Sequence, residues 1–116
     1  MSAAPDHDPN GDYCVVFTTC ASGEDAGNLA TTLLRERLAA CVQVVDIKSY
    51  YVWNDEHVNE PEKLLLIKTR ADLYPAIEAT LGRVHPYETP EIVCLPVVAG
   101  SPDYLRWIDG ATKEAV

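Results

Sequence analysis

The segment HPYETPE, residues 85–91, gathers more titratable side chains than any other connection in this chain. His85 offers an imidazole nitrogen, and Glu88 and Glu91 offer carboxylate oxygens, which zinc and copper both accept as ligands. Two prolines restrict the backbone of the segment, so these ligands would be held in a fixed arrangement. The segment therefore predicts a metal-binding site.

A structural role for His85 stays open beside this interpretation, because a histidine that follows a helix often hydrogen-bonds carbonyl groups at the helix end. Catalysis is not expected. The sequence has no nucleophile elbow, no glycine-rich phosphate loop after a strand and no cysteine–histidine pair at a recognisable spacing. Glu88 and Glu91 could share acid–base work only if their surroundings separated their pKa values. We therefore expect a protein that is not an enzyme.

The four cysteines are expected to be free thiols, since none belongs to a C-x-x-C pair or to a second cluster with zinc-site spacing. Cys14 and Cys94 lie in strand-like runs, where a small apolar residue fits a core. Packing in the core is the interpretation favoured for both.

Three further side chains suggest a second kind of site. Lys68 lies within an apolar strand, either as a charge on a sheet edge or as a buried cation held for an anionic group. Trp53 is more typical of interface packing than of a ligand-stacking platform. Together with Tyr87, Lys68 and Trp53 would suit a cleft between subunits that binds a small anion or a partner protein.

Composition and charge limit the partners. The chain has 116 residues, enough for one domain, and its net charge of -9 comes from 18 acidic against 9 basic residues. That charge disfavours nucleic acid and anionic membranes, and it is compatible with cations. No apolar run approaches the roughly 20 residues of a membrane span. Residues 1–12 are polar, lack the pattern of a secretory signal, and predict a disordered tail on a cytoplasmic protein.

Residues 13–116 are expected to form the domain. Apolar and β-branched runs predict strands, and apolar residues at helical spacing predict helices. Ser22 and Asp25 have the spacing of a capping box at the start of the first helix, and Ser101 with Pro102 predicts the start of the last. The predicted strands are 13–19, 42–53, 63–69 and 91–98, with a polar break at 54–62, and the predicted helices begin near 22, 72 and 101, the second ending at Gly82.

The order β-α-β-β-α-β followed by a helix predicts an α+β fold, a split βαβ arrangement with an antiparallel sheet and both main helices on one face. The arm 42–53 carries apolar residues on both of its alternating faces. Only one face can be covered by the helices of the same chain, so the other would meet water in a monomer. The sequence therefore predicts an oligomer.

Five motifs in order then resemble the divalent-cation tolerance protein family, CutA. They are ERLAACV (36–42), SYYVW (49–53), LLLIKT (64–69), HPYETPE (85–91) and LPVVAGSPDYLRWI (95–108). The resemblance covers about residues 13–108. It implies a ferredoxin-like domain in a compact homotrimer whose subunits contact one another through long hairpins. It also implies a role in tolerance to divalent metals, copper in particular. It also implies a likeness to trimeric nitrogen-regulatory PII proteins, and hence an alternative role as a sensor of a small ligand.

Carried onto this chain, the resemblance matches His85 to the motif histidine and Cys41 to a second proposed metal ligand. Some members have a cysteine where this chain has Thr18, for which Cys20 could substitute, and a histidine where this chain has Val84. The expectations are a homotrimer that binds a divalent metal ion, with copper or another divalent metal as the candidate cofactor. The predicted ligands are His85, Cys41, Cys20, Glu88 and Glu91.

Overall fold

The structure is a computed structural model, and it describes residues 12–114. The predicted tail over residues 1–12 lies outside the described residues, apart from Asp12. The elements follow one another in the order β1 (Tyr13–Cys20), α2 (Gly23–Arg35), β2 (Cys41–Trp53), β3 (Glu56–Arg70), a 3₁₀ turn η1 (Ala71–Leu73), α3 (Tyr74–Val84), β4 (Val93–Pro96) and α4 (Pro102–Ala111).

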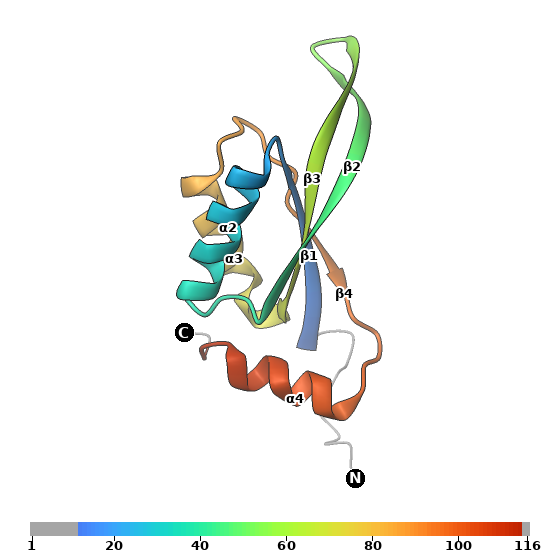
Figure 1. The fold of residues 1–116 in the computed structure, drawn as a ribbon. Helices are drawn as coiled ribbons and strands as arrows, with labels where there is room; N and C mark the ends of the chain where they lie inside the picture. The colour runs from blue at the N-terminus through green and yellow to red at the C-terminus, as the bar shows by residue number, and fades with distance from the viewer. Residues whose placement is uncertain (1–11, 115–116) are drawn as a thin grey trace.

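The four strands form one antiparallel sheet in the order β2-β3-β1-β4 (Figure 1). This order and the sequence of elements are those of the ferredoxin-like α+β fold, as predicted. The register places Val16 opposite Ile67 on β3 and opposite Cys94 on β4. The two outer strands, β2 and β4, each leave one edge unpaired within the described chain.

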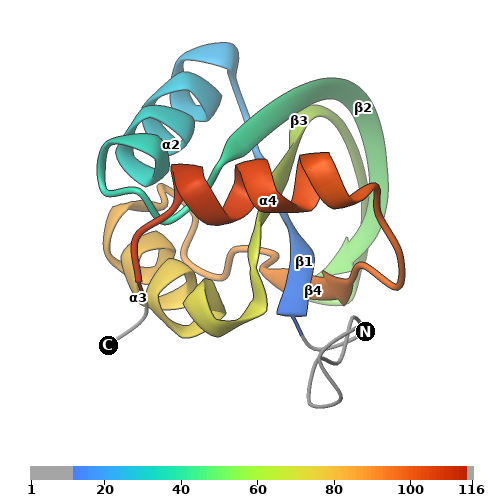
Figure 2. The ribbon, with the colours of Figure 1, turned by 90° about the horizontal axis from the view of Figure 1, so that it is seen from below.

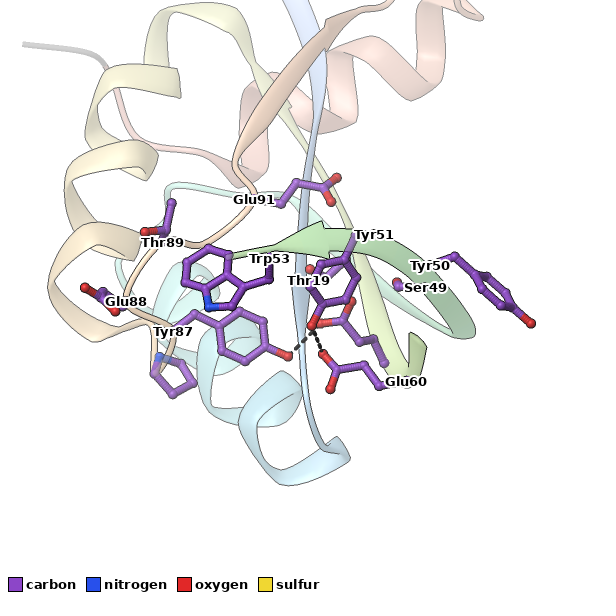
Figure 3. Close-up of a pocket in the computed structure, with 12 residues that line it drawn as sticks. Thr19, Ser49, Tyr50, Tyr51, Trp53, Glu60, Tyr87, Glu88, Thr89 and Glu91 are labelled. Atoms are coloured by element: carbon purple, nitrogen blue, oxygen red, sulfur yellow. Dashed lines mark hydrogen bonds between the residues drawn. The ribbon is translucent and has the colours of Figure 1, made fainter. Parts of the chain in front are cut away.

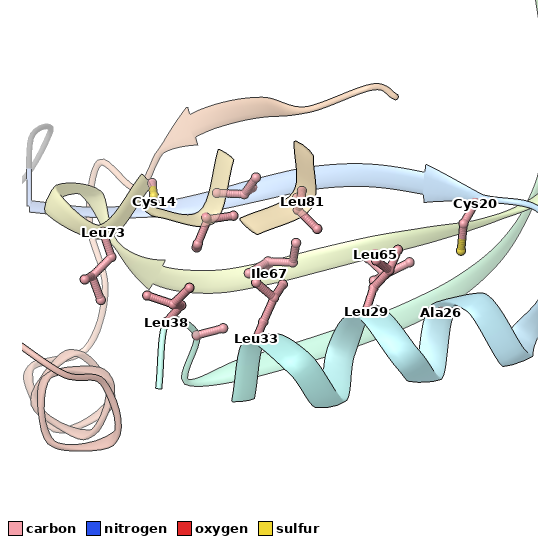
Figure 4. Packing of buried hydrophobic residues seen from close by; sticks show 13 residues of the cluster. Cys14, Cys20, Ala26, Leu29, Leu33, Leu38, Leu65, Ile67, Leu73 and Leu81 are labelled. Carbon is pink, nitrogen blue, oxygen red and sulfur yellow. The ribbon is translucent and has the colours of Figure 1, made fainter. Parts of the chain in front are cut away.

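Helices α2 and α3 cover one face of the sheet, and the core lies between them and the strands (Figures 1 and 4). The Ser22 side chain caps α2 by accepting a 3.1 Å hydrogen bond from the Asp25 backbone N–H, which confirms the predicted start. The helix ends at Arg35, and Arg37 just beyond it has a φ of 58°, outside the helical region. The core residues come from every layer, and they include Cys14, Val16, Leu29, Leu33, Leu38, Leu65, Ile67, Ile77 and Leu81.

The hairpin of β2 and β3 is longer than predicted. The polar stretch 54–62 was expected to separate the two strands, but only Asn54 and Asp55 form the turn, and β3 begins at Glu56. Both turn residues have positive φ, 51° and 66°, the conformation of a two-residue turn that matches the twist of the flanking strands. Polar residues of low strand propensity therefore belong to the hairpin because their backbones pair with β2. The hairpin projects from the body of the domain (Figure 1).

The second half departs from the predicted boundaries by a few residues. Gly82 lies inside α3, and the helix ends at Val84 with the His85 N–H bound to the Leu81 carbonyl. β4 covers only Val93–Pro96 of the predicted strand 91–98, so the HPYETPE segment is a loop along its whole length. Helix α4 begins at Pro102 and crosses the end of the sheet where β1 starts (Figure 2).

Many apolar side chains stay exposed in this single chain. They gather on the hairpin, on β4 and on α4, and they include Val44, Val45, Tyr50, Val52, Trp53, Val93, Leu95 and Trp107. Cys14 is buried as predicted, whereas the prediction for Cys94 is wrong: it is exposed, because β4 is an edge strand. All four cysteines are free thiols. Over the described residues, no helix is long and apolar enough to cross a membrane.

Candidate functional site

A cavity of about 640 Å³ lies where the loop after α3 folds against the hairpin (Figure 3). Its walls come from the end of β1, from β2 and β3, and from the HPYETPE loop. The lining residues are Thr19, Ser49, Tyr50, Tyr51, Trp53, Glu60, Glu62, Pro86, Tyr87, Glu88, Thr89 and Glu91. Residues from four separate segments therefore meet at one place.

His85 anchors the loop to the sheet through both of its ring nitrogens. The Tyr87 backbone N–H donates to Nδ1 at 3.1 Å, so Nε2 carries the proton and donates to the Thr19 carbonyl at 2.9 Å. Burial lowers the pKa of His85 below its ordinary value of 6.5, with the Thr19 hydrogen bond opposing that shift. His85 is thus a neutral side chain with no free lone pair in this arrangement. Its role is structural, but its ring binds a carbonyl of β1 rather than the carbonyls at the helix end that were expected.

Tyr87 joins the same loop to the hairpin. Its hydroxyl donates a 2.6 Å hydrogen bond to Oε2 of Glu62, whose residue is only 7% exposed. Burial and this hydrogen bond raise the pKa of Tyr87, so the phenol stays protonated and remains a donor. The His85 and Tyr87 rings lie 5.1 Å apart at an interplanar angle of 47°. The loop is therefore fixed by side chains on both sides of Pro86.

A second tyrosine–glutamate pair lies on the hairpin itself. The Tyr51 hydroxyl donates to Oε1 of Glu60, and this hydrogen bond raises the pKa of Tyr51 to about 12. In Figure 3 the rings of Tyr51, Trp53 and Tyr87 lie close to one another beside the cavity, and Tyr50 points away from them. Three aromatic side chains and two tyrosine-bound carboxylates thus form the inner part of the site.

The charge of the lining is entirely of one sign. Four glutamates line the cavity, and no lysine, arginine or histidine does. Glu60 and Glu62 are directed to the tyrosine hydroxyls, whereas Glu88 and Glu91 are exposed at the loop. Carboxylates attract cations and repel anions, and a partly enclosed site concentrates that effect. The cavity is therefore suited to a positively charged ligand.

The structure does not bring the five predicted metal ligands together in one chain. His85 and Cys20 lie at one end of β1, since Thr19 contacts His85. Cys41 pairs with Lys68, five residues along β3 from Lys63, the partner of Cys20. At about 3.3 Å per residue, the two cysteines are separated by roughly 17 Å along the sheet.

The individual donors also differ in availability. Cys20 is buried, its thiol donates to the Ser22 carbonyl, and burial raises its pKa. Glu88 and Glu91 are exposed, and Cys41 is half-buried. Within residues 12–114, no group of three or more His, Cys, Asp or Glu side chains is placed to hold a metal ion. The predicted set does not fit a metal as a complete coordination sphere within one protomer.

The structure brings together only two of the three residues predicted for a cleft between subunits. Trp53 and Tyr87 do line one cavity, but Lys68 lies elsewhere, with its Nζ 5.7 Å from the Tyr104 ring centre on α4. Nor is Lys68 an edge charge, because β3 is an inner strand of the sheet. Within one chain, the cavity therefore does not include the cation that was expected for anion binding.

Sequence reasoning missed Glu60 and Glu62. Both belong to the stretch 54–62 that was read as a polar break, and the structure places them on β3. Their spacing of two residues was the available signal, because alternate residues of a strand point to the same face. The strand itself was not predicted there, so the signal was not used.

Comparison with known proteins agrees with this architecture. The sequence profile of the CutA1 divalent ion tolerance protein family matches residues 14–111. The divalent-cation tolerance protein CutA of Thermus thermophilus is 43% identical over 95 residues, which cover 81% of this chain and 92% of that protein. Protein CutA of the mouse is 38% identical over 104 residues, covering 89% of this chain but only 59% of the mouse protein. The chain thus spans less than two thirds of some relatives.

Solved structures show the same fold. CutA1 from rice, Oryza sativa, has a TM-score of 0.86 at 36% identity, with 91% of this chain and 98% of that chain covered. The Thermus thermophilus protein has a TM-score of 0.84 at 41% identity, covering 87% and 99%. At this identity and coverage, the likeness extends to sequence as well as topology.

Proposed function

Because the chain belongs to the CutA1 divalent ion tolerance protein family, we propose that it is a homotrimeric protein without catalytic activity that binds divalent metal ions, copper among them, in the cytoplasm. The observation that carries this proposal is the acidic cavity at the base of the hairpin. Four glutamates line it, and no basic side chain does.

The exposed carboxylates are the proposed points of attachment. Glu88 and Glu91 lie at the loop side of the cavity and are open to solvent. Carboxylate oxygen is a ligand for zinc and, with nitrogen or sulfur donors, for copper. One protomer supplies an incomplete coordination sphere, so the remaining ligands would come from water or from another subunit.

The exposed apolar surface supports the trimer. The hairpin arm and β4 expose valines and leucines on strands whose outer edges are unpaired within the described residues. Soluble proteins avoid long unpaired apolar edges, and pairing between subunits removes them. The chain measures 53 × 26 × 23 Å, elongated along the projecting hairpin (Figure 1), so the hairpin is able to reach past its own domain.

The alternative of a PII-like sensor for an anionic ligand receives less support from this cavity. An anion would face four glutamates, and Lys68 lies near Tyr104 rather than beside Trp53. Like charges placed together oppose binding. Binding of a partner protein to the assembled trimer would be a separate property of its outer surface.

The metal proposal is tested by calorimetric titration of the full chain with Cu(II) and with Zn(II). The double variant Glu88→Gln/Glu91→Gln keeps the size of both side chains and removes their charge. We expect its dissociation constant to rise at least about tenfold, which corresponds to roughly 1.4 kcal/mol. The matched control is Glu36→Gln/Glu78→Gln, two exposed glutamates associated with α2 and α3 that do not line the cavity. Equal effects of both pairs would overturn the assignment.

The trimer is tested separately by size-exclusion chromatography with light scattering. A mass of three chains at micromolar concentration is the expected result. A stable monomer at that concentration would contradict the proposed trimer. The metal titration would still test whether the acidic cavity binds metal.

A further inference from the structure

The size of the cavity at the base of the hairpin exceeds what a single metal ion requires. Its volume of about 640 Å³ falls within the ~300–1,000 Å³ typical of small-molecule sites. A bare divalent ion also needs several oxygens that converge on one point, at about 2–2.6 Å. The described residues provide no such group of three acidic, histidine or cysteine donors. The shape of the site therefore points to a larger ligand.

Glu62 indicates the charge of that ligand. It is 93% buried, it lines the cavity, and its carboxylate accepts a hydrogen bond from the uncharged Tyr87 hydroxyl. Among the described residues it forms no ion pair; the neighbouring Lys63 instead binds Asp46 at 2.6 Å. A buried carboxylate is normally paired with a cation, because a hydrogen bond alone does not neutralise its charge. Within the described part of one chain, Glu62 therefore presents to the cavity a negative charge that a cationic ligand would balance.

The aromatic walls indicate the chemical type of the cation. Trp53, Tyr51 and Tyr87 lie close together beside the carboxylates (Figure 3). Aromatic faces attract alkylammonium groups through their quadrupoles, and rings grouped around one space are the usual receptor for such groups. Both tyrosines donate their hydroxyl protons to glutamates, so their rings rather than their oxygens are available to a ligand. A hydrated metal ion gains little from these walls.

We infer that this cavity binds a small organic cation with an ammonium group, with the alkyl part against Trp53, Tyr51 and Tyr87 and the charge near Glu62 and Glu60. The inference deepens the proposed function at the same cavity: the ammonium charge lies at the inner carboxylates of Glu62 and Glu60, whereas the metal ion is proposed at Glu88 and Glu91 on the loop side. Binding is reversible and involves no covalent step.

The test uses the full chain in buffer with a chelator, so that its outcome does not depend on metal. Choline is titrated by calorimetry beside 3,3-dimethylbutanol, the neutral molecule of the same shape, and 1,4-diaminobutane tests a primary ammonium. We expect choline, diaminobutane or both to bind at least about tenfold more tightly than the neutral alcohol, since cation–π contacts and a desolvated carboxylate each contribute on that scale. No binding of either cation at 10 mM (roughly the weakest affinity expected of a specific site), or equal binding of all three, would overturn the inference.

Two variants locate the site. Glu62→Gln keeps an acceptor for Tyr87 and removes the charge, and Trp53→Leu removes an aromatic face and keeps an apolar side chain. Each is expected to weaken binding of the better cation by roughly tenfold. The matched controls are Glu78→Gln and Trp107→Leu; Trp107 is 48% exposed, close to the 46% of Trp53, and lies on α4.

The controls should bind the cation within about twofold of the unmodified chain. Light scattering verifies that every variant keeps the assembly of the unmodified chain. If the Trp53→Leu variant fails to assemble, the cation affinity of the Glu62→Gln variant alone tests the location of the site. Unchanged affinity in Glu62→Gln would overturn the placement of the charge, whatever the metal titration shows.

Discussion

The hydroxyl of Tyr87 donates a 2.6 Å hydrogen bond to the buried carboxylate of Glu62, and so connects the loop after α3 to strand β3 across 25 residues of sequence. In Figure 3 a dashed line begins at the Tyr87 hydroxyl, close to the Tyr51 side chain. The pair gives the loop a fixed position against the hairpin. We therefore expect the stability of the domain to depend on this hydrogen bond.

Replacing Tyr87 by phenylalanine should lower the free energy of unfolding by about 1–3 kcal/mol, because the buried Glu62 loses its hydrogen-bond donor. Urea denaturation at fixed protein concentration measures the change. Tyr50→Phe is the control, since Tyr50 is 74% exposed, and it should stay within about 0.5 kcal/mol of the unmodified chain. When Tyr87→Phe is made in the Glu62→Gln variant, the loss of unfolding free energy should be smaller than in the unmodified chain. An equal loss in both backgrounds would mean that Tyr87 and Glu62 are not coupled.

His85 should make stability depend on pH. Burial lowers its pKa in the folded state below the ordinary 6.5, so the unfolded chain binds more protons between the folded pKa and 6.5. Its contribution is therefore fully present above about pH 6.5 and decreases as the pH falls through the folded pKa. Thermal or urea unfolding between pH 5 and 8 measures the slope.

The control for this effect is the exposed His57 near the hairpin tip. The variant His85→Gln should flatten the pH dependence in that range, and His57→Gln should leave it as it is. A slope that survives in His85→Gln would assign the dependence to another group. His85→Gln should also be less stable at pH 8 by about 1–3 kcal/mol if one of the two backbone partners is left unpaired.

The two N-terminal caps provide a matched pair of serines. Ser22 accepts a hydrogen bond from the Asp25 N–H, whereas Ser101 caps α4 with no side-chain hydrogen bond. Ser22→Ala should therefore cost about 0.5–2 kcal/mol of stability, and Ser101→Ala should cost less than about 0.5 kcal/mol. Chemical denaturation compares the two, and an equal loss in both would show that the Ser22 hydrogen bond is not the cause.

The hairpin turn should be improved by glycine. Asp55 has a φ of 66°, in the left-handed region where glycine pays no steric cost. Asp55→Gly is expected to raise stability by about 0.5–1 kcal/mol, since it creates the favoured Asn-Gly turn. Lys48→Gly, in the interior of β2, should lower stability by a similar amount. It is the control for the backbone entropy that a glycine adds to the unfolded chain. A loss of stability in Asp55→Gly would contradict this interpretation.

Assembly should be sensitive to charge on the exposed edge strand. Leu95 on β4 and Leu34 on α2 are 42% and 44% exposed in one protomer. A buried interface would reject a lysine at position 95, so Leu95→Lys should shift the assembly towards monomer in light scattering, and Leu34→Lys should not. If both variants keep the same mass, β4 is not part of the subunit contact.

Local patterns predicted several features correctly. Ser22 and Asp25 placed the start of α2, and the apolar residues that recur along it at helical spacing, Ala26, Leu29 and Leu33, are buried. Pairs three or four residues apart meet on one face of a helix whatever the rest of the fold does. The excess of apolar residues on the arm 42–53 likewise predicted surface that one chain cannot cover, and those residues are exposed.

Long-range contacts were not predictable in the same way. The sequence placed Lys68 with Trp53 and Tyr87, but the strand order puts it beside α4, near Tyr104. The apolar run around Cys94 predicted a core residue, but β4 is an edge strand and Cys94 is exposed. In both cases, a correct local pattern gave no information about the neighbour across the sheet.

The sequence by itself thus determined the order of the elements, their amphipathic faces and one of the four segments that line the cavity. Only the tertiary structure decided that His85 uses both ring nitrogens on backbone groups, and that Glu62 meets Tyr87 rather than water. The physical reason is that caps and periodic faces depend on neighbours a few residues apart. Burial, charge pairing and strand register depend instead on packing between segments that lie up to 66 residues apart, such as His85 and Thr19.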